Sequence, residues 1–135
     1  MDYLQEAREM FKHDIYATET SGIVIDEADK GYGKCSMKIE RRHMNAGNMV
    51  MGGAIFTLAD FAFGIAANAG NPTTVTLNST ISYINVARGD TLIAEAHVVK
   101  SGKSTCVVNI RVYDNLGNEV AISTMTGFRK SKQLG

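Results

Sequence analysis

The segment that decides the fold is residues 45–71, NAGNMVMGGAIFTLADFAFGIAANAGN. Its middle is apolar apart from one ionisable side chain, Asp60. Hydrophobic residues around the whole circumference of a helix indicate that it is buried in the core of the protein. Gly70 and Pro72 supply a stop signal, so the sequence predicts a central helix over residues 52–69. A lone carboxylate inside such a helix needs a physical reason.

The rest of the chain is mostly typical of β-strands, with β-branched or alternating apolar residues between turns. The predicted strands span residues 21–27, 33–40, 74–86, 92–100, 105–113 and 119–128. Short turns between successive strands favour an antiparallel sheet, and the central helix is expected to fill its concave side. A short amphipathic helix is predicted over residues 3–13, with Asp2 available as its N-cap. The predicted fold class is therefore α+β.

The alternation also places apolar side chains on the other face of the sheet. In the predicted strands that begin at residues 92 and 105, every second residue, counted from Leu92 and from Cys106, faces the helix. Ile93, Val99 and Val107 then fall on the opposite face. Because one helix cannot cover both faces, we expect an interface between copies of the chain.

Composition limits the kind of protein. A chain of 135 residues with 44% hydrophobic residues is long enough for one core, so we expect a single domain over residues 1–135. The zero net charge disfavours a nucleic-acid partner. Cys35 and Cys106 lie in strand-like runs, which favours a reducing compartment. With no signal-peptide or membrane-spanning pattern, we expect a soluble cytoplasmic protein and no membrane partner.

Asp60 is best explained as a functional group. On a helix it shares a face with Gly53, Gly64 and Ala67, so a ligand or another backbone can approach it closely. Such an aspartate can also cap a turn or pair with a cation that the fold brings from elsewhere. Burying an unpaired carboxylate is costly or raises its pKa, so we favour the functional interpretation.

Gly52 and Gly53 lie where the loop enters the predicted helix. Their amides would be among the unsatisfied N–H groups at the positive helix end, which suit a carbonyl oxygen or an oxyanion. Two adjacent glycines can also form only a tight turn. The indication of function therefore depends on their combination with Asp60.

Other kinds of site lack their sequence signatures. His13, His43 and His97 do not have metal-ligand spacing, and we expect His43 in a loop and His97 in a strand. The chain has no GxxxxGK[ST] phosphate loop and no GxSxG nucleophile elbow. We therefore expect neither a metal nor a bound cofactor.

An ordered set of residues resembles a known family. The set consists of Asn45, Gly47, Met51-Gly52-Gly53, Leu58-Ala59-Asp60, the RGDTL run at residues 88–92, and Gly102-Lys103. From about Ser21 onward the chain resembles the hotdog-fold acyl-CoA thioesterases of the phenylacetate-pathway, or PaaI-like, type. The resemblance implies a long helix wrapped by a curved antiparallel sheet. It also implies homodimers that commonly pair into homotetramers, with active sites between subunits.

The same resemblance implies a reaction, the hydrolysis of acyl-CoA to free acid and CoA. Asp60 would be the catalytic carboxylate, either as nucleophile or as the general base for a water. The amide of Gly52 or Gly53 would polarise the thioester carbonyl. Asn45 would bind the thioester region or help to place the water, and Thr76 would orient the water.

The substrate contacts that we expect follow from the same comparison. They are Met51, Phe56, Phe63, Arg88, Gly89, Lys103 and Ser104. The CoA phosphates are expected near Arg88, Lys103 or the basic pair Arg129-Lys130.

Met51 is a departure from the family pattern, which has a histidine before the two glycines. Methionine cannot donate the hydrogen bond of that ring, whereas the glycine amides are unaffected. The alternative function is therefore a non-catalytic hotdog protein that binds acyl-CoA or an aromatic ligand. A hotdog hydratase of enoyl thioesters usually pairs a histidine with an acid. It is disfavoured here because His43 lies well before the helix.

Overall fold

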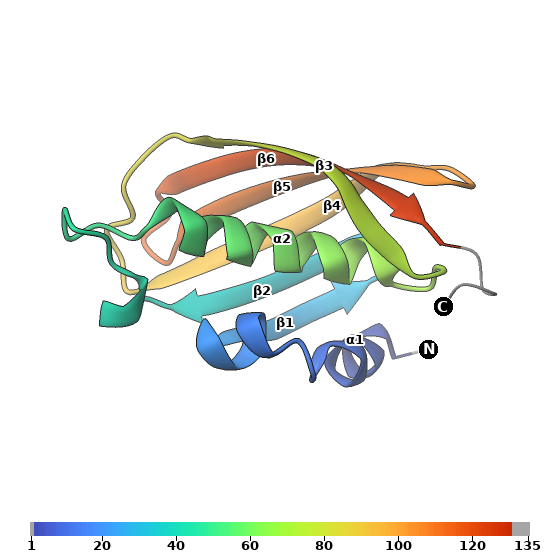
Figure 1. The fold of residues 1–135 in the computed structure, drawn as a ribbon, viewed down its shortest axis with the longest axis horizontal. Coiled ribbons are helices and arrows are strands. Elements are labelled where there is room, and N and C mark those ends of the chain that lie inside the picture. Colours follow the sequence, from blue (N-terminus) through green and yellow to red (C-terminus); the bar gives the residue numbers. More distant parts are fainter. Residues whose placement is uncertain (1, 131–135) are drawn as a thin grey trace.

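The computed structural model describes residues 2–130. They form one antiparallel sheet of six strands with a long helix against it and a short helix at the N-terminal end (Figure 1). The elements are α1 (Tyr3–Phe11), a π-helical turn (Tyr16–Thr20), β1 (Ile23–Asp29), β2 (Tyr32–Lys38), a 3-10 turn (Arg41–His43), α2 (Gly52–Asn68), β3 (Thr74–Tyr83), β4 (Thr91–Ser101), β5 (Thr105–Asp114) and β6 (Glu119–Arg129). This arrangement confirms the predicted α+β hotdog fold.

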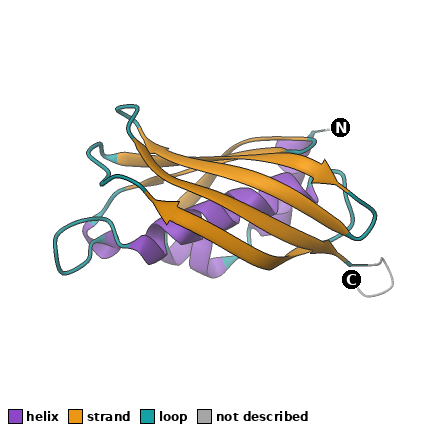
Figure 2. Ribbon diagram, turned by 90° about the horizontal axis from the view of Figure 1, so that it is seen from above, coloured by secondary structure: helices purple, strands orange, loops and turns teal. Residues whose placement is uncertain are grey.

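The sheet has the strand order β1-β2-β4-β5-β6-β3, and α2 lies along its concave side (Figure 2). Leu58, Ala59, Ala62 and Ala66 of α2 are completely buried. Two strand glycines allow the close approach of helix and sheet. A Cβ atom at Gly33 of β2 would lie 2.7 Å from Cβ of Ile65. At Gly127 of β6 it would lie 2.8 Å from the Phe63 ring, so neither position tolerates a side chain without movement of α2.

The predicted alternation of the strands is confirmed. Leu92, Ala94 and Ala96 of β4 are buried beneath α2, and Val99 on the other face is largely exposed. The predicted strand over residues 74–86 ends earlier, at Tyr83. The amides of Ile84 and Asn85 both turn to the carbonyl oxygen of Val120, at 2.8 and 3.3 Å, so the backbone leaves the regular ladder there.

Helix α1 packs beside β1 (Figure 1). The Arg8 guanidinium donates a hydrogen bond to the carbonyl oxygen of Ile25 at 2.9 Å. At the C-terminal end of α1, the ring of Phe11 meets the ring of Phe61 edge to face, with the centroids 5.3 Å apart. The same ring lies over Gly64, where an added Cβ would be 3.5 Å away. These contacts place the N-terminal segment against the solvent-facing side of α2.

Strand β3 is an edge strand that pairs only with β6 among the described strands. A bulge between Thr76 and Asn78 interrupts the pairing, and Leu77 at the bulge is 59% exposed. Tyr83 at the end of the strand is 50% exposed. A long edge strand with exposed apolar side chains is ready to pair with another strand.

Arg129 is a buried residue of β6. Its guanidinium donates to the carbonyl oxygen of Ala67 at 3.0 Å, to Oγ1 of Thr74 at 2.8 Å and to Oγ of Ser101 at 2.6 Å. A cation is favourable at the C-terminal end of a helix such as α2. The expectation that Arg129 binds a CoA phosphate is therefore wrong, because its donors are used inside the fold.

Candidate active site

Asp60 lies in the middle of α2 and faces a cavity of about 360 Å³. The cavity has walls from α2, from the start of β3, and from the segment that follows α1. It brings together four residues proposed from the sequence, namely Phe56, Asp60, Phe63 and Thr76. Among its other lining residues are Phe11, Asp14 and Tyr16, which the sequence did not indicate as site residues. We call this space the Asp60 cavity.

The Asp60 carboxyl is partly buried, and its pKa is raised. Burial is the main cause, because it disfavours the charged form, and the negative charge of Asp14 adds to the shift. The Thr76 hydroxyl opposes it by donating to Oδ1 of Asp60 at 3.4 Å. A carboxylate with a raised pKa is a stronger base than a solvated one, which suits it to accept a proton from water.

The start of α2 presents two backbone donors, the amides of Gly52 and Gly53, whereas the next two amides are bonded within the helix start. Ala54 and Ile55 donate their amides to the carbonyl oxygen of Met51, at 3.0 and 3.2 Å. Among the hydrogen bonds of residues 2–130, none uses the amide of Gly52 or Gly53. A Cβ atom added at Gly53 would meet nothing within 4 Å, so the helix surface at Gly53 has room for an incoming group, whereas at Gly52 it would contact the Tyr83 ring at 3.4 Å. Such amides can bind an oxygen that carries developing negative charge.

Asn45 organises the loop before the helix. Its side-chain oxygen accepts from the amides of Gly47 and Met49, at 2.9 and 3.1 Å. The loop is also held by His43, which is buried and lies in the 3-10 turn instead of an irregular loop. The ring of His43 accepts from the Glu40 amide at 2.9 Å through Nδ1, and its Nε2 lies 2.8 Å from the carbonyl oxygen of Ser21. A Glu N-cap with His three residues later is an unusual capping pair, which is why the sequence did not reveal it.

Within one chain, the helix start and Asp60 do not meet. Eight residues of α2 separate Gly52 from Asp60, or about 12 Å along the axis. The N–H groups of a helix point toward its N-terminus, away from Asp60. Asn45 and Gly52 instead line a separate cavity of about 290 Å³ together with Tyr83, whose hydroxyl donates to the Gly52 carbonyl at 3.2 Å. Met51 beside it is 56% exposed.

The residues expected near CoA are also apart. Arg88 and Gly89 lie in the loop before β4, whereas Lys103 and Ser104 lie in the turn after it. An eleven-residue strand such as β4 spans about 35 Å, so one chain does not bring these pairs together. Gly89 has a structural reason to be glycine, since an added Cβ would lie 1.9 Å from Oδ1 of Asn115.

The loop that carries Arg88 is held by a buried carboxylate. Asp114 accepts hydrogen bonds from the amides of Arg88, Gly89, Leu116 and Asn118 and from the side chain of Asn118. Burial alone would raise the pKa of Asp114, but these hydrogen bonds outweigh that effect and lower it. Asp114 is therefore a structural carboxylate, in contrast to Asp60.

Residues 2–130 contain no cluster of three or more His, Cys, Asp or Glu side chains arranged to hold a metal ion. None of the helices in this range combines the length and the hydrophobicity needed to cross a bilayer.

A family model described as the thioesterase superfamily matches residues 47–121. This range includes α2, the Asp60 carboxylate and β3 to β5. The chain belongs to the thioesterase superfamily.

Relatives of known name lie within this superfamily. The chain is 33% identical over 133 residues to the acyl-coenzyme A thioesterase PaaI of Escherichia coli, covering 97% of this chain and 91% of the relative. It is 30% identical over 117 residues to human acyl-coenzyme A thioesterase 13, covering 84% and 80% of the two chains. The resemblance to PaaI-like proteins that the sequence motifs indicated is thus confirmed.

Solved structures give the same relationship. The structure of E. coli PaaI matches with a TM-score of 0.90 at 30% identity, over 96% of this chain and 94% of that one. A Streptococcus mutans protein, solved bound to acetyl-CoA, matches with a TM-score of 0.78 at 31% identity. That match covers 82% of this chain and 90% of the S. mutans chain.

Proposed function

We propose that this thioesterase-superfamily protein hydrolyses acyl-CoA thioesters, with Asp60 as the catalytic carboxylate. The observation that carries the proposal is the carboxyl group of Asp60, partly buried, with a raised pKa, in a cavity on α2. The names of the relatives and the acetyl-CoA in the S. mutans structure support the substrate class. No cofactor takes part in the proposed reaction.

The chemistry can follow either of two routes. As a general base, Asp60 takes a proton from water while the water oxygen attacks the thioester carbon. As a nucleophile, it attacks that carbon itself, and water then hydrolyses the resulting anhydride. In both routes the C–S bond breaks, and the CoA sulfur leaves with the bonding electron pair and is protonated. The Thr76 hydroxyl, which donates to Oδ1 of Asp60 at 3.4 Å, would orient the carboxylate or the water.

The carbonyl oxygen becomes negatively charged during either route. We assign its stabilisation to the amides of Gly52 and Gly53, which donate no hydrogen bond to a described residue. A Cβ atom added at Gly53 would meet nothing within 4 Å, whereas one at Gly52 would contact the Tyr83 ring at 3.4 Å. Each such donor contributes on the order of 10² to 10³ in rate. Asn45 can add its side-chain NH₂ group, because its carbonyl oxygen already serves the loop.

The separation of these groups favours a site shared by two subunits. A second copy that pairs antiparallel along the edge of β3 would bring the helix start of one chain toward the Asp60 cavity of the other. The same two-fold pairing brings opposite ends of two sheets together, so Arg88 of one chain can approach Lys103 and Ser104 of its partner. Met51, Phe56 and Phe63 would then lie around the thioester. A homodimer is the smallest assembly that completes this site.

Release of free thiol from acyl-CoA tests the reaction directly. Asp60→Asn should reduce turnover by about 10² to 10⁴, because the amide can neither accept a proton from water nor attack the carbonyl. Asp29→Asn, a substitution at an exposed position on β1, is the control for removing a surface charge. Unchanged turnover in Asp60→Asn would refute the mechanism. If the unmodified protein binds acyl-CoA saturably and hydrolyses none, the non-catalytic alternative is correct.

A further inference from the structure

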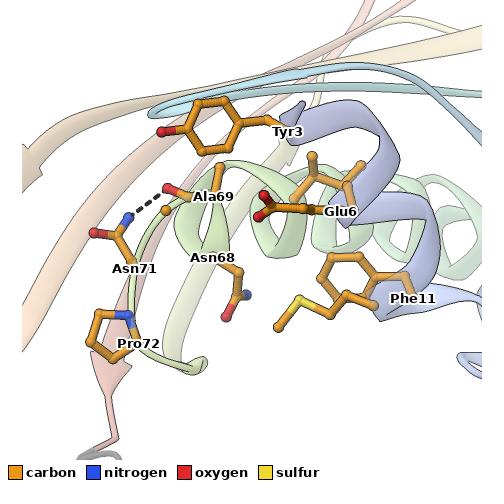
Figure 3. A pocket seen from close by; sticks show the side chains of 11 residues that line it. Tyr3, Glu6, Phe11, Asn68, Ala69, Asn71 and Pro72 are labelled. Carbon is orange, nitrogen blue, oxygen red and sulfur yellow. Dashed lines mark hydrogen bonds between the residues drawn. The ribbon is translucent and has the colours of Figure 1, made fainter. Parts of the chain in front are cut away.

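A second and larger cavity lies between α1 and the C-terminal end of α2. Its volume is about 600 Å³, within the range of small-molecule sites. Figure 3 shows Tyr3, Glu6 and Phe11 of α1 on one side and Asn68, Ala69, Asn71 and Pro72 on the other. We call this space the α1 cavity.

The α1 cavity is adjacent to the Asp60 cavity. Phe11 and Asn68 line both of them, so they form the boundary between the two spaces. Asp60, Gly64 and Asn68 are spaced by four residues and follow one face of α2, about 6 Å per step. Because Gly64 has no side chain, this face of α2 leaves room for the Phe11 ring above it. A Cβ atom added at Gly64 would lie 3.5 Å from that ring, in van der Waals contact. The path from Asp60 to the boundary is therefore about 12 Å long.

The walls of the α1 cavity suit an apolar chain. Met10, Phe11, Ile65 and Pro72 contribute hydrocarbon, sulfur and ring surface. Asn68 contributes no unsatisfied polar group to the boundary. Its amide nitrogen donates to the carbonyl oxygen of Gly64 at 2.8 Å, and its oxygen accepts from the Thr74 amide at 2.8 Å. The carboxylate of Glu6 would repel an acyl group that carries a negative charge.

We propose that the α1 cavity receives the distal part of the acyl chain while the thioester lies at Asp60. The inference rests on the proposed function and adds a substrate class to it, namely uncharged acyl groups long enough to pass Phe11. Phe11 then acts as a specificity-determining residue at the boundary. Helix α1, which lies outside the range matched by the family model, sets the preferred chain length.

The test compares the turnover of octanoyl-CoA and acetyl-CoA as a ratio of kcat/KM values. Met10→Trp fills the α1 cavity and should lower the octanoyl to acetyl ratio about tenfold or more. Glu9→Trp adds the same ring at the neighbouring, exposed position of α1, outside the cavity lining, and should keep the wild-type ratio. Gly64→Leu narrows the passage from the α2 side and should lower the ratio as well.

Gly64→Leu changes α2 instead of α1 and raises helix propensity, but its side chain must displace the Phe11 ring, so it serves as a second, independent variant. If both Met10→Trp and Gly64→Leu keep the wild-type ratio of octanoyl-CoA to acetyl-CoA turnover, the inference is overturned. Thermal melting, monitored by circular dichroism, identifies a variant that has lost its fold. The variant that remains folded then tests the inference. If the unmodified protein releases thiol from other acyl-CoAs but not from octanoyl-CoA, this inference fails while the proposed function stands. If it releases thiol from no acyl-CoA, both fail.

Discussion

Burial is the main cause of the raised pKa of Asp60, and two neighbours then act on it in opposite directions. Asp14 raises the pKa of Asp60 by repulsion, whereas the hydrogen bond from Thr76 lowers it. A base must be deprotonated to work, so thiol release should increase as pH rises through the pKa of Asp60. Asp14→Asn should move this acidic limb to lower pH, and Thr76→Val should move it to higher pH. The pH profiles of kcat/KM measure both shifts, and shifts in the same direction would contradict the assignment.

The helix-start donors can be tested one at a time by removing an amide proton. Gly53→Pro deletes the donor in the first turn of α2, where proline is tolerated because no intrahelical bond is lost. Gly53→Ala keeps the donor and adds a methyl group in open space. We expect kcat of the proline variant to fall about 10² to 10³ below that of the alanine variant. Equal kcat values would exclude the Gly53 amide from the transition state.

At the scale of elements, Asp114 holds the loop between β3 and β4 against the turn between β5 and β6. Asp114→Asn replaces one acceptor oxygen by an NH₂ group that faces backbone donors, and should cost about 2 to 4 kcal/mol of unfolding free energy. Urea unfolding at neutral pH measures this cost. A cost near zero would show that the network is not needed for stability.

The same carboxylate predicts how stability varies with pH. The folded protein lowers the pKa of Asp114, so its stabilising contribution is complete above the ordinary pKa of an aspartate. The contribution is lost as pH falls toward the lowered value. The difference between wild type and Asp114→Asn should therefore shrink in acid, as urea unfolding at several pH values would show. A difference that grows in acid would contradict the sign of the shift.

The elements themselves were largely predictable from the sequence. Hydrophobic periodicity gave α1, α2 and all six strands, because each buries one face or its whole surface. The π-helical turn at Tyr16–Thr20 was missed, since a short turn with mixed residues has no periodic pattern. The buried roles of His43, Asp114 and Arg129 were missed as well. Their partners come from distant parts of the chain, and a polar residue does not show from sequence alone that it is buried.

The candidate site was predictable only in part. Asp60 stood out because it is a carboxylate in an apolar helix, and the fold brings Thr76 to it across sixteen residues. Phe11 and Asp14 reach the same cavity from more than forty residues away, and no pattern in the sequence links them to it. Arg88 and Lys103 matched family positions but lie at opposite ends of β4 in one chain.

At the scale of the whole molecule, this separation explains why one chain would not be a complete enzyme. Asp60 and the amides at the start of α2 lie too far apart to contact one carbonyl group. The exposed edge of β3 offers a way for two chains to pair. In the proposed homodimer each of the two sites would take Asp60 from one chain and Gly53 from the other.

Mixing two inactive variants tests this shared site most directly. Asp60→Asn and Gly53→Pro subunits, unfolded and refolded together in equal amounts, should form mixed dimers as half of the population. Each mixed dimer has one intact site, so the mixture should regain about a quarter of wild-type thiol release. Each variant refolded alone should stay inactive. A mixture that contains mixed dimers but remains as inactive as its components would contradict a site made from two subunits.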